Sequence, residues 1–327
     1  MISLTTRRHE WELREPFATA RDCITHVPVL MVELRGSSGA LGRAEAAGVD
    51  YDGETLASMA AQLSSVAPQL HDSVTGEELL RLLPAGGARN ALDCALWDLR
   101  AKETGTRAYA ACGLETLHPV TTVLTIGLCS EADTRRRARD AQGYPVLKVK
   151  LDAERHIDVV RIVREELPTV RLLVDANQSW SRGLLERLWP QLQALRVELI
   201  EQPVARGDDA SLEGLATGVP LAADESCTDR GSLPALMGRY QYVNVKLDKC
   251  GGLTEALALC SEARRRGLGL MVGNMCGSSL AMAPAFLVAQ QCSYVDLDGP
   301  LLQRLDSSPA IRFEHGLMYP PLPQLWG

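Results

Sequence analysis

Five short apolar runs decide the fold, and each ends in polar or ionisable side chains: PVLKVKL (145–151), RLLVDAN (171–177), VELIEQP (197–203), PLAADES (220–226) and QYVNVKLD (241–248). Each run has the length and the apolar content of a buried strand. Amphipathic helical patterns, as at 152–166 and 253–266, alternate with such runs. This alternation is typical of parallel strands joined by crossover helices.

Three further runs, at 119–127, 268–275 and 293–299, complete the pattern. The resulting eight strands are the number that a closed barrel of parallel strands and helices requires. We therefore predict an α/β chain in which residues 117–305 form a TIM-like (β/α)8-type barrel with short loops.

The first 116 residues differ in pattern and predict a small α+β domain. The expected strands are 27–34 and 40–46, and the expected helices are 54–66, 76–83 and 87–104. A Gly-Ser-Ser-Gly turn between the two strands is typical of an antiparallel hairpin, and Gly105 is the expected stop of the last helix. We expect the C-terminal tail, 306–327, to return to this domain.

The composition argues against several classes of protein. The 327 residues are 46% apolar and 23% charged, as in globular rather than disordered proteins. A net charge of -7 argues against a nucleic-acid partner, and no apolar run reaches the roughly 20 residues of a membrane span. Charges interrupt the apolar stretch that a signal peptide would need at the start, MISLTTRRHEWELREP, so we expect a cytoplasmic protein. The acidic net charge favours a small molecule over a nucleic acid as the partner.

The cysteines and histidines show no metal or disulfide pattern. The nine cysteines are an odd, scattered set without a C-x-x-C pair, which argues against a disulfide framework and a zinc knuckle. The six histidines lack H-x-H and H-E-x-x-H spacing. The predicted chemistry therefore depends on carboxylates and lysines. The sequence leaves open whether the chain forms a homo-oligomer.

Side chains alternate between the two faces of a strand, so each run has one apolar and one polar face. Five ionisable residues of the polar faces, one from each run, serve as markers: Lys150, Asp175, Glu201, Asp224 and Lys246. Their spacings of 25, 26, 23 and 22 residues each equal about one strand and helix. All five lie near the carboxyl ends of their strands, where barrel active sites are built. One such carboxylate could simply cap a helix, but five residues in one register predict a site.

Three carboxylates from successive strands, without sulfur or imidazole, suit a hard divalent cation, and octahedral Mg²⁺ fits best. Asp175, Glu201 and Asp224 are therefore the predicted ligands of one Mg²⁺ per chain. Lys150 and Lys246 would lie on either side of the ion, where a lysine could remove a proton next to a carboxylate while the metal neutralises the enediolate. We expect burial and neighbouring cations to lower the pKa of the lysine that acts as the base.

The chain resembles the enolase superfamily, in particular its muconate-lactonizing subgroup, in KVK (148–150), VDAN (174–177), EQP (201–203), ADES (223–226) and NVKLDKCGG (244–252). PFATAR (16–21) and GGARNALDCALWDLRAKETG (86–105) resemble the capping domain of that subgroup. The resemblance implies a (β/α)7β barrel with an N-terminal α+β capping domain. It also implies that the two lysines serve as acid and base.

The sequence DLDGP, which begins at Asp296, resembles the dipeptide epimerases in particular. The resemblance implies that Asp296 and Asp298 bind the α-ammonium group of a dipeptide, and that Lys148 and Asn274 also bind substrate, Lys148 at its carboxylate. Arg21 resembles a capping-loop arginine that pairs with the side-chain carboxylate of a terminal glutamate, a bidentate role that suits a guanidinium. The implied reaction is epimerisation of L-Ala-D/L-Glu from murein peptides by a two-base 1,1-proton transfer.

Other functions stay open at this point. The subgroup includes N-acylamino acid racemases, o-succinylbenzoate synthases and cycloisomerases, whose substrates offer no ammonium group to the two aspartates. The side-chain specificity is open too, because Val123 stands where relatives often carry threonine and the loop 46–55 does not closely match the expected second specificity loop. Outside the family, the alternatives are a metal-free Schiff-base lyase and a metal-binding barrel without catalysis.

Overall fold

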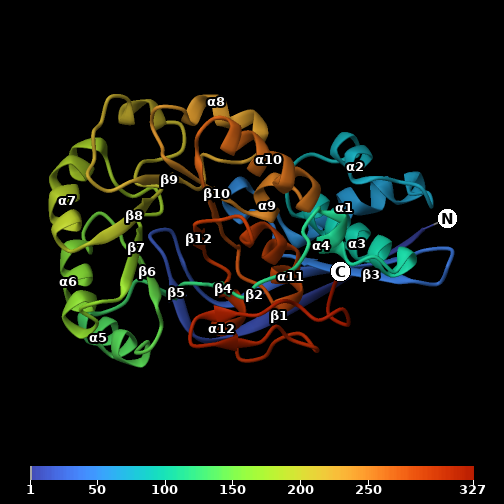
Figure 1. The fold of residues 1–327 in the computed structure, drawn as a ribbon, viewed down its shortest axis with the longest axis horizontal. Helices are drawn as coiled ribbons and strands as arrows, with labels where there is room; N and C mark the ends of the chain where they lie inside the picture. Colours follow the sequence, from blue (N-terminus) through green and yellow to red (C-terminus); the bar gives the residue numbers. More distant parts are fainter. Residues whose placement is uncertain (1) are drawn as a thin grey trace.

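The computed structural model describes residues 2–327, and the N-terminal part forms an antiparallel sheet with helices packed against it (Figure 1). Its strands, in the order β1-β2-β3, are β1 (Ser3–Ala18), β2 (Cys23–Arg35) and β3 (Leu41–Ala46). Its helices are α1 (Leu56–Val66), α2 (Gly76–Leu82), α3 (Gly87–Thr104) and α4 (Ala108–Ala111), with 3₁₀ turns at Asp50–Asp52 and Ala67–Gln69.

Two predictions for this part are confirmed. The β2 and β3 strands form the expected hairpin, paired from Leu30 with Ala46 to Arg35 with Leu41. The α3 helix ends at Thr104, and the predicted stop residue Gly105 follows it with a φ of 68°, the left-handed conformation that glycine reaches without steric cost.

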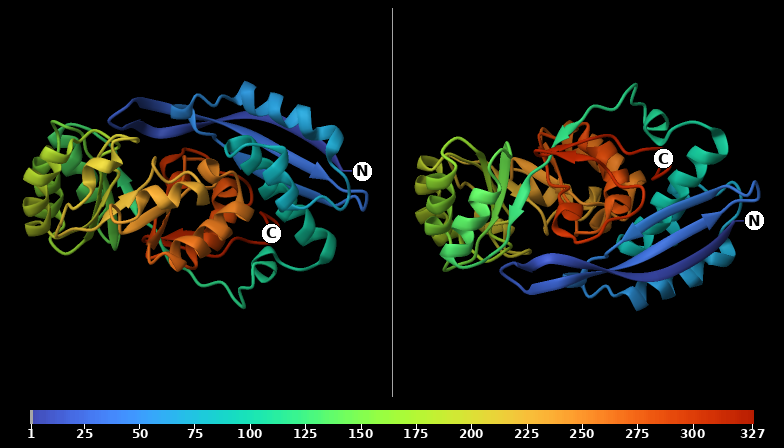
Figure 2. Two further views of the ribbon diagram at one scale, coloured as in Figure 1. Left: turned by 90° about the horizontal axis from the view of Figure 1, so that it is seen from above. Right: turned by 90° about the horizontal axis from the view of Figure 1, so that it is seen from below.

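The β1 strand is absent from the predicted set. Most of its side chains are exposed, so it lacks the apolar alternation by which a strand is predicted. Backbone pairing with β2 holds it instead, from Ser3 with Arg35 to Ala18 with Cys23. The turn between the two strands reaches along the barrel, where Leu128 N–H donates to Ala18 O at 2.8 Å (Figure 2). This turn carries Arg21.

The rest of the chain is built on a parallel sheet in the order β12-β11-β10-β9-β8-β7-β6-β5. The eight strands are β5 (Leu124–Ile126), β6 (Val146–Lys150), β7 (Arg171–Asp175), β8 (Val197–Glu201), β9 (Leu221–Ala223), β10 (Tyr242–Val245), β11 (Gly269–Val272) and β12 (Tyr294–Val295). The sheet curls so that its two edges approach each other, and Val123 N–H donates to Val295 O at 2.9 Å between them. The predicted eight-stranded TIM-like barrel is confirmed.

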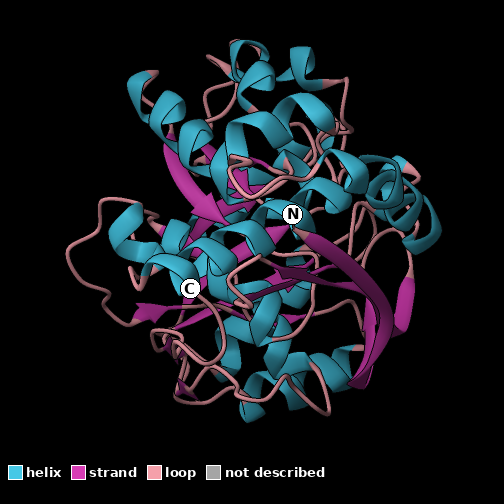
Figure 3. Ribbon diagram, turned by 90° about the vertical axis from the view of Figure 1, so that its right-hand side faces the viewer, coloured by secondary structure: helices cyan, strands magenta, loops and turns pink. Residues whose placement is uncertain are grey.

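Helices lie around the curled sheet (Figure 3). They are α5 (Glu131–Asp140), α6 (Ile157–Glu166), α7 (Arg182–Ala194), α8 (Leu233–Leu236), α9 (Leu247–Cys250), α10 (Leu253–Arg265), α11 (Ser279–Ala289) and α12 (Gly299–Leu302). The β8 strand is followed by a 3₁₀ turn, Asp209–Leu212, and another turn at Arg230–Ser232 precedes α8.

Two predicted elements have wrong boundaries. The run 119–127 is two strands, because β4 (Val120–Thr121) leaves the barrel and joins a small sheet with β13 (Phe313–Glu314) and β14 (Leu317–Met318). The helix expected from residue 152 begins at Ile157. Asp152 Oδ1 accepts from the backbone N–H groups of Glu154 and Arg155, and this turn delays the helix.

The interior of the barrel is divided by polarity along the strands. An apolar layer fills its lower part, made by Val123, Val146, Leu173, Leu199, Ala222 and Met271. The ionisable residues lie on the same inward faces, two or more positions further along each strand. The ionisable side chains on the inward faces of the strands therefore lie above this apolar layer.

The C-terminal tail lies against α3. Trp326 Nε1–H donates to Cys94 O at 3.0 Å, and Gly327 N–H donates to Asp98 Oδ1 at 2.7 Å. The division into domains near residue 116 stays a prediction, and it falls between α4 and β4. Within residues 2–327, no helix is long and apolar enough to cross a membrane.

Candidate active site

The five residues predicted from strand spacing meet at the carboxyl ends of the barrel strands. Lys150 pairs with Asp175 in the strand register, and Asp175 pairs with Glu201, so these three lie at one level. Asp224 directly follows β9 and Lys246 directly follows β10. None of the five is more than 8% exposed. Ionisable groups buried this deeply must compensate one another.

Asp175, Glu201 and Asp224 could hold a metal ion, because one oxygen from each lies within 4.8 Å of the others. The group fits a hard cation, since every donor is a carboxylate oxygen. Glu201 Oε2 is buried and makes no hydrogen bond. Lys148 Nζ lies 2.6 Å from this oxygen as an ion pair without hydrogen-bond geometry. An oxygen in this state is available as a ligand.

The three carboxyl groups differ in proton affinity. Burial raises the pKa of Glu201 to about 8, and the negative charge of Asp175 adds to the effect. Burial also opposes ionisation of Asp175, but the two lysines of β6 outweigh it and lower the pKa. Lys246 and Lys249 likewise outweigh burial and lower the pKa of Asp224. Of the three, Glu201 holds a proton most readily.

Lys150 and Lys246 contact different members of the carboxylate group. Lys150 Nζ donates to Asp175 Oδ2 at 2.7 Å, and Lys246 Nζ donates to Asp224 Oδ2 at 2.7 Å. The expected lowering of the lysine pKa is wrong for Lys246. Burial alone would lower this pKa, but the charge of Asp224 dominates and raises it. A cation shared by the carboxylates would weaken that attraction.

The residues implied to bind the ends of the substrate already make contacts within the chain. Lys148 is 1% exposed, and its Nζ donates to Asp296 Oδ2 at 2.7 Å. Asp298 Oδ2 accepts from Thr125 N–H at 2.7 Å, while burial and the charge of Asp296 raise the pKa of Asp298 to about 7. Asn274 Nδ2 donates to Asp296 O at 2.6 Å. Each group therefore has a partner within the chain.

Arg21 reaches this cluster from the turn between β1 and β2. Its guanidinium forms an ion pair with Glu225, whose side chain is fully buried, and lies 4.6 Å from the centre of the Tyr51 ring. Glu225 Oε2 and the Tyr51 hydroxyl are buried without a hydrogen-bond partner. Because Glu225 follows Asp224 in the chain, the ion pair of Arg21 belongs to the site and not to the outer surface.

A cavity of about 250 Å³ lies between the N-terminal part of the chain and the barrel. Among the residues that line it are Phe17, Arg21, Ile24, Lys150, Asn177, Lys246 and Asn274. Both lysines that border the carboxylate group therefore line one cavity, which a small substrate could enter.

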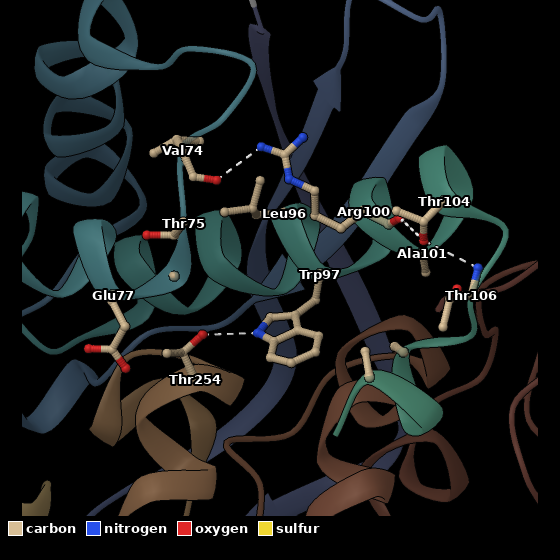
Figure 4. A pocket seen from close by; sticks show the side chains of 13 residues that line it. Val74, Thr75, Glu77, Leu96, Trp97, Arg100, Ala101, Thr104, Thr106 and Thr254 are labelled. Atoms are coloured by element: carbon tan, nitrogen blue, oxygen red, sulfur yellow. Dashed lines mark hydrogen bonds between the residues drawn. The ribbon is translucent and has the colours of Figure 1, made fainter. Parts of the chain in front are cut away.

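A second cavity, of about 550 Å³, lies between α2, α3 and the start of α10 (Figure 4). Trp97 lines it, and its Nε1–H donates to Thr254 Oγ1 at 2.9 Å. Its ionisable lining residues are Glu77 and Arg100. It contains neither a cluster of carboxylates nor a lysine, so the smaller cavity is the candidate active site.

Two family patterns cover most of the chain. The mandelate racemase/muconate lactonizing enzyme N-terminal domain matches residues 1–110, and the enolase C-terminal domain-like family matches residues 131–323. The chain belongs to the enolase superfamily. The family resemblance inferred from the strand-end motifs is thereby confirmed.

Relatives of this enolase superfamily member are named as epimerases and racemases, which are isomerases. The L-Ala-D/L-Glu epimerase of Escherichia coli K12 is 42% identical over 94% of this chain and 97% of the relative. An N-acetyl-D-glutamate racemase of Pseudoalteromonas is 45% identical over 76% of this chain and 79% of the relative.

A solved structure of an Agrobacterium tumefaciens enolase family member is also similar, with a TM-score of 0.97 and 37% identity over 100% of both chains. That protein is described as homologous to dipeptide epimerases and contains bound sodium and L-Ala-L-Glu.

Sequence reasoning missed Lys249, Glu225 and Tyr51. For Lys249 a signal was available in the composition of this enolase superfamily member. The chain has 34 lysines and arginines together, but its only lysines are 102, 148, 150, 246 and 249. Four of these five lie buried in the cluster. Outside the cluster, every Lys or Arg position except 102 is an arginine, so the concentration of lysines marks Lys249 as a member of the site.

Proposed function

We propose that this chain is a Mg²⁺-dependent dipeptide epimerase and that L-Ala-D/L-Glu is its substrate. The observation that carries the proposal is the pair Lys150 and Lys246, which border a buried carboxylate group and line one cavity. The similarity to the Escherichia coli epimerase supports the choice of dipeptide.

Asp175, Glu201 and Asp224 would hold one Mg²⁺ per chain. When bound, the ion supplies positive charge that neutralises the negative charge developing on the substrate carboxylate. Lys148, which contacts Glu201, would bind the same carboxylate. A proton on the adjacent α-carbon then becomes easier to remove.

Lys150 and Lys246 would exchange roles as base and acid at that α-carbon. In one direction the first lysine, deprotonated, takes the α-proton, and the second, protonated, returns a proton from the opposite side. The C–H bond on one side of the α-carbon breaks and a new C–H bond forms on the opposite side, which inverts the configuration of the α-carbon. One proton leaves and one is returned, so atoms and charge balance. Both groups must lie within hydrogen-bond reach of the α-carbon's proton, which their common cavity permits.

Asp296 and Asp298 would bind the α-ammonium group of the dipeptide, with Asn274 beside them. A cation at this position would relieve the repulsion by which Asp296 raises the pKa of Asp298. Arg21 would bind the glutamate side chain in competition with Glu225.

A second candidate, racemisation of an N-acylated glutamate, is favoured by one observation. Asp296 already accepts from Lys148, and Asp298 already accepts from Thr125 N–H, so the acidic pair has partners without a substrate ammonium. The similarity to the Pseudoalteromonas racemase supports this alternative. Arg21 and the two catalytic lysines would keep the same roles, because this substrate has the same glutamate α-carbon and side chain.

One experiment separates the two candidates. The protein is incubated with Mg²⁺ in D₂O and each of L-Ala-L-Glu, L-Ala-L-Leu and N-acetyl-D-glutamate, and mass spectrometry measures uptake of one deuterium. We expect rapid uptake with inversion for L-Ala-L-Glu and slow uptake for L-Ala-L-Leu. Faster uptake by N-acetyl-D-glutamate would favour the second candidate, and no uptake by any of the three would contradict both.

A further inference from the structure

In each proposed metal ligand, one carboxylate oxygen is held by a group that takes no part in the proposed proton transfer. The three holding bonds run from Asn177 N–H to Asp175 Oδ1 at 2.9 Å, from Asn244 Nδ2 to Glu201 Oε1 at 2.7 Å, and from Lys249 Nζ to Asp224 Oδ1 at 2.6 Å. A carboxylate held in this way cannot rotate freely, so the direction of its second oxygen is fixed.

The second oxygen of each carboxylate faces a lysine of the cavity or the barrel interior. These contacts join Lys150 Nζ to Asp175 Oδ2 at 2.7 Å, Lys148 Nζ to Glu201 Oε2 at 2.6 Å, and Lys246 Nζ to Asp224 Oδ2 at 2.7 Å. Each carboxylate thus has one oxygen with a permanent partner and one oxygen whose partner can change.

Lys249 is the charged member of the three holding groups. Its Nζ donates to Asp224 Oδ1, to the backbone oxygen of Asp224 and, at 3.0 Å, to the backbone oxygen of Asn244. An ammonium group has three N–H donors, and all three are used here. The side chain is 1% exposed and lies on α9, three residues after Lys246. Lys249 therefore has no capacity left for substrate.

We propose that Lys249 is a positioning residue: it holds Asp224 Oδ1, so that Oδ2 stays available to the cation and Lys246 stays free to transfer protons. This inference rests on the proposed function, because it needs Asp224 as a metal ligand. Two lysines contact this one carboxylate. Without Lys249, the ammonium of Lys246 would be the main ionic contact that orients Asp224, and proton transfer would disturb that orientation.

The charge of Lys249 and its hydrogen bonds act in opposite directions on cation affinity. A buried positive charge repels a divalent cation, so removal of the charge alone would strengthen binding. Loss of a group that orients a ligand weakens binding, typically by about 10- to 100-fold. The direction of the change on removing Lys249 therefore distinguishes a positioning role from a purely electrostatic one.

The test is a titration with Mn²⁺, a spectroscopic substitute for Mg²⁺, followed by electron paramagnetic resonance. We expect Lys249→Met and Lys249→Arg each to bind Mn²⁺ at least about tenfold more weakly than the wild type. Arginine keeps the charge, but its planar guanidinium does not reproduce the three bonds of an ammonium. Tighter binding by Lys249→Met, or unchanged affinity in both variants, overturns the inference.

Lys102→Met is the matched control. Lys102 also donates to a buried carboxylate, Asp98 Oδ2 at 2.6 Å, but lies on α3 outside the site. It should retain wild-type affinity for Mn²⁺. If it loses affinity as Lys249→Met does, the effect is general destabilisation and the inference fails.

Thermal unfolding without metal shows which variants fold. If Lys249→Met does not fold, Lys249→Arg decides the question: a loss of about tenfold or more supports the inference, and unchanged affinity overturns it. If the wild type itself binds no Mn²⁺ or Mg²⁺, the proposed metal-dependent function is overturned and the inference with it. Unchanged variants beside a metal-binding wild type overturn the inference alone.

Discussion

Arg21 has two carboxylates to choose between, the buried Glu225 and the side chain of the proposed glutamyl substrate. Glu225 holds the guanidinium at the cavity in the structure described here, with the Tyr51 ring against it. Because the Arg21 guanidinium is already held at the cavity, its side chain needs little rearrangement when a substrate binds. Residue identity at this position is therefore expected to control which dipeptide is accepted.

We expect Arg21→Met to raise KM for L-Ala-L-Glu by about 10- to 100-fold, because a hydrogen bond to a charged group contributes about 1.5 to 3 kcal/mol. Steady-state kinetics with L-Ala-L-Glu and L-Ala-L-Leu measure the effect. Turnover of the apolar dipeptide should stay equal or improve. Glu225→Gln, which removes only the competing charge, should keep or lower KM for L-Ala-L-Glu. Equal losses for both dipeptides with Arg21→Met would contradict the role.

The site residues that could be predicted are the ionisable residues that stand at the ends of regularly spaced strands. Lys150, Asp175 and Glu201 lie at one level because each ends a strand of the predicted register. Lys249 could not be found in this way, since it lies on the short helix α9 and reaches back to Asp224. The pKa of Lys246 also depends on the carboxylate actually beside it, which no spacing gives.

At the scale of elements, strands buried on both faces were predictable and the exposed strand was not. The runs that became β6 to β10 are apolar for most of their length, because helices cover one face and the barrel interior covers the other. The β1 strand has no such requirement, because β2 fixes it by backbone pairing. Likewise β4 leaves the barrel to pair with β14, a partner almost 200 residues away in the chain.

The β3 strand is joined to the loop before α11 by a buried carboxyl group. Glu45 accepts from Ser278 N–H and Ser278 Oγ, both at 2.7 Å, and from Trp11 Nε1 at 3.2 Å. Burial raises the pKa of Glu45 to about 7, and the charge of Asp306 contributes in the same direction. The loop carries Asn274, so this contact also supports the cavity wall.

This contact predicts a pH-dependent stability. Because the folded-state pKa of Glu45 lies above its ordinary value of 4.5, the folded state binds the proton more strongly, and the stabilisation decreases as the pH rises from about 4.5 to about 7. Urea unfolding measures the free energy of unfolding of the wild type and of Glu45→Gln. Between pH 4.5 and pH 8, the free energy of unfolding of the wild type should fall relative to that of Glu45→Gln by up to about 3 kcal/mol. Parallel pH profiles would contradict the buried carboxyl.

At the scale of the whole molecule, closure of the barrel brings together groups from strands far apart in sequence. The fold class was predictable, because eight apolar runs at regular spacing leave few other arrangements. The contacts between the N-terminal part and the barrel were not. Gly48 N–H donates to Asp248 Oδ1 at 2.9 Å across 200 residues, and no local pattern encodes such a contact.

Since the three carboxylates converge only in the folded chain, Mg²⁺ should stabilise the fold. We expect a rise in the free energy of unfolding of about 2.7 kcal/mol at a concentration 100 times Kd. Asp175→Asn and Asp224→Asn should lose this increment and nearly all turnover, whereas Glu10→Gln on the exposed face of β1 should keep both. Thermal unfolding with and without Mg²⁺ provides the measurement. Full turnover in EDTA would contradict a metal site.

Lys150 and Lys246 are proposed to act on one α-carbon from opposite sides, and α-proton NMR in D₂O tests this two-base mechanism most directly. Each pure epimer of Ala-Glu is incubated with Lys150→Arg and with Lys246→Arg, since arginine keeps the charge but does not act as a base near neutral pH. We predict that neither variant epimerises the dipeptide. Each should still exchange the α-proton of one epimer, and the two variants should select opposite epimers. Exchange of the same epimer by both variants, or epimerisation by either at the wild-type rate, would contradict the two-base assignment.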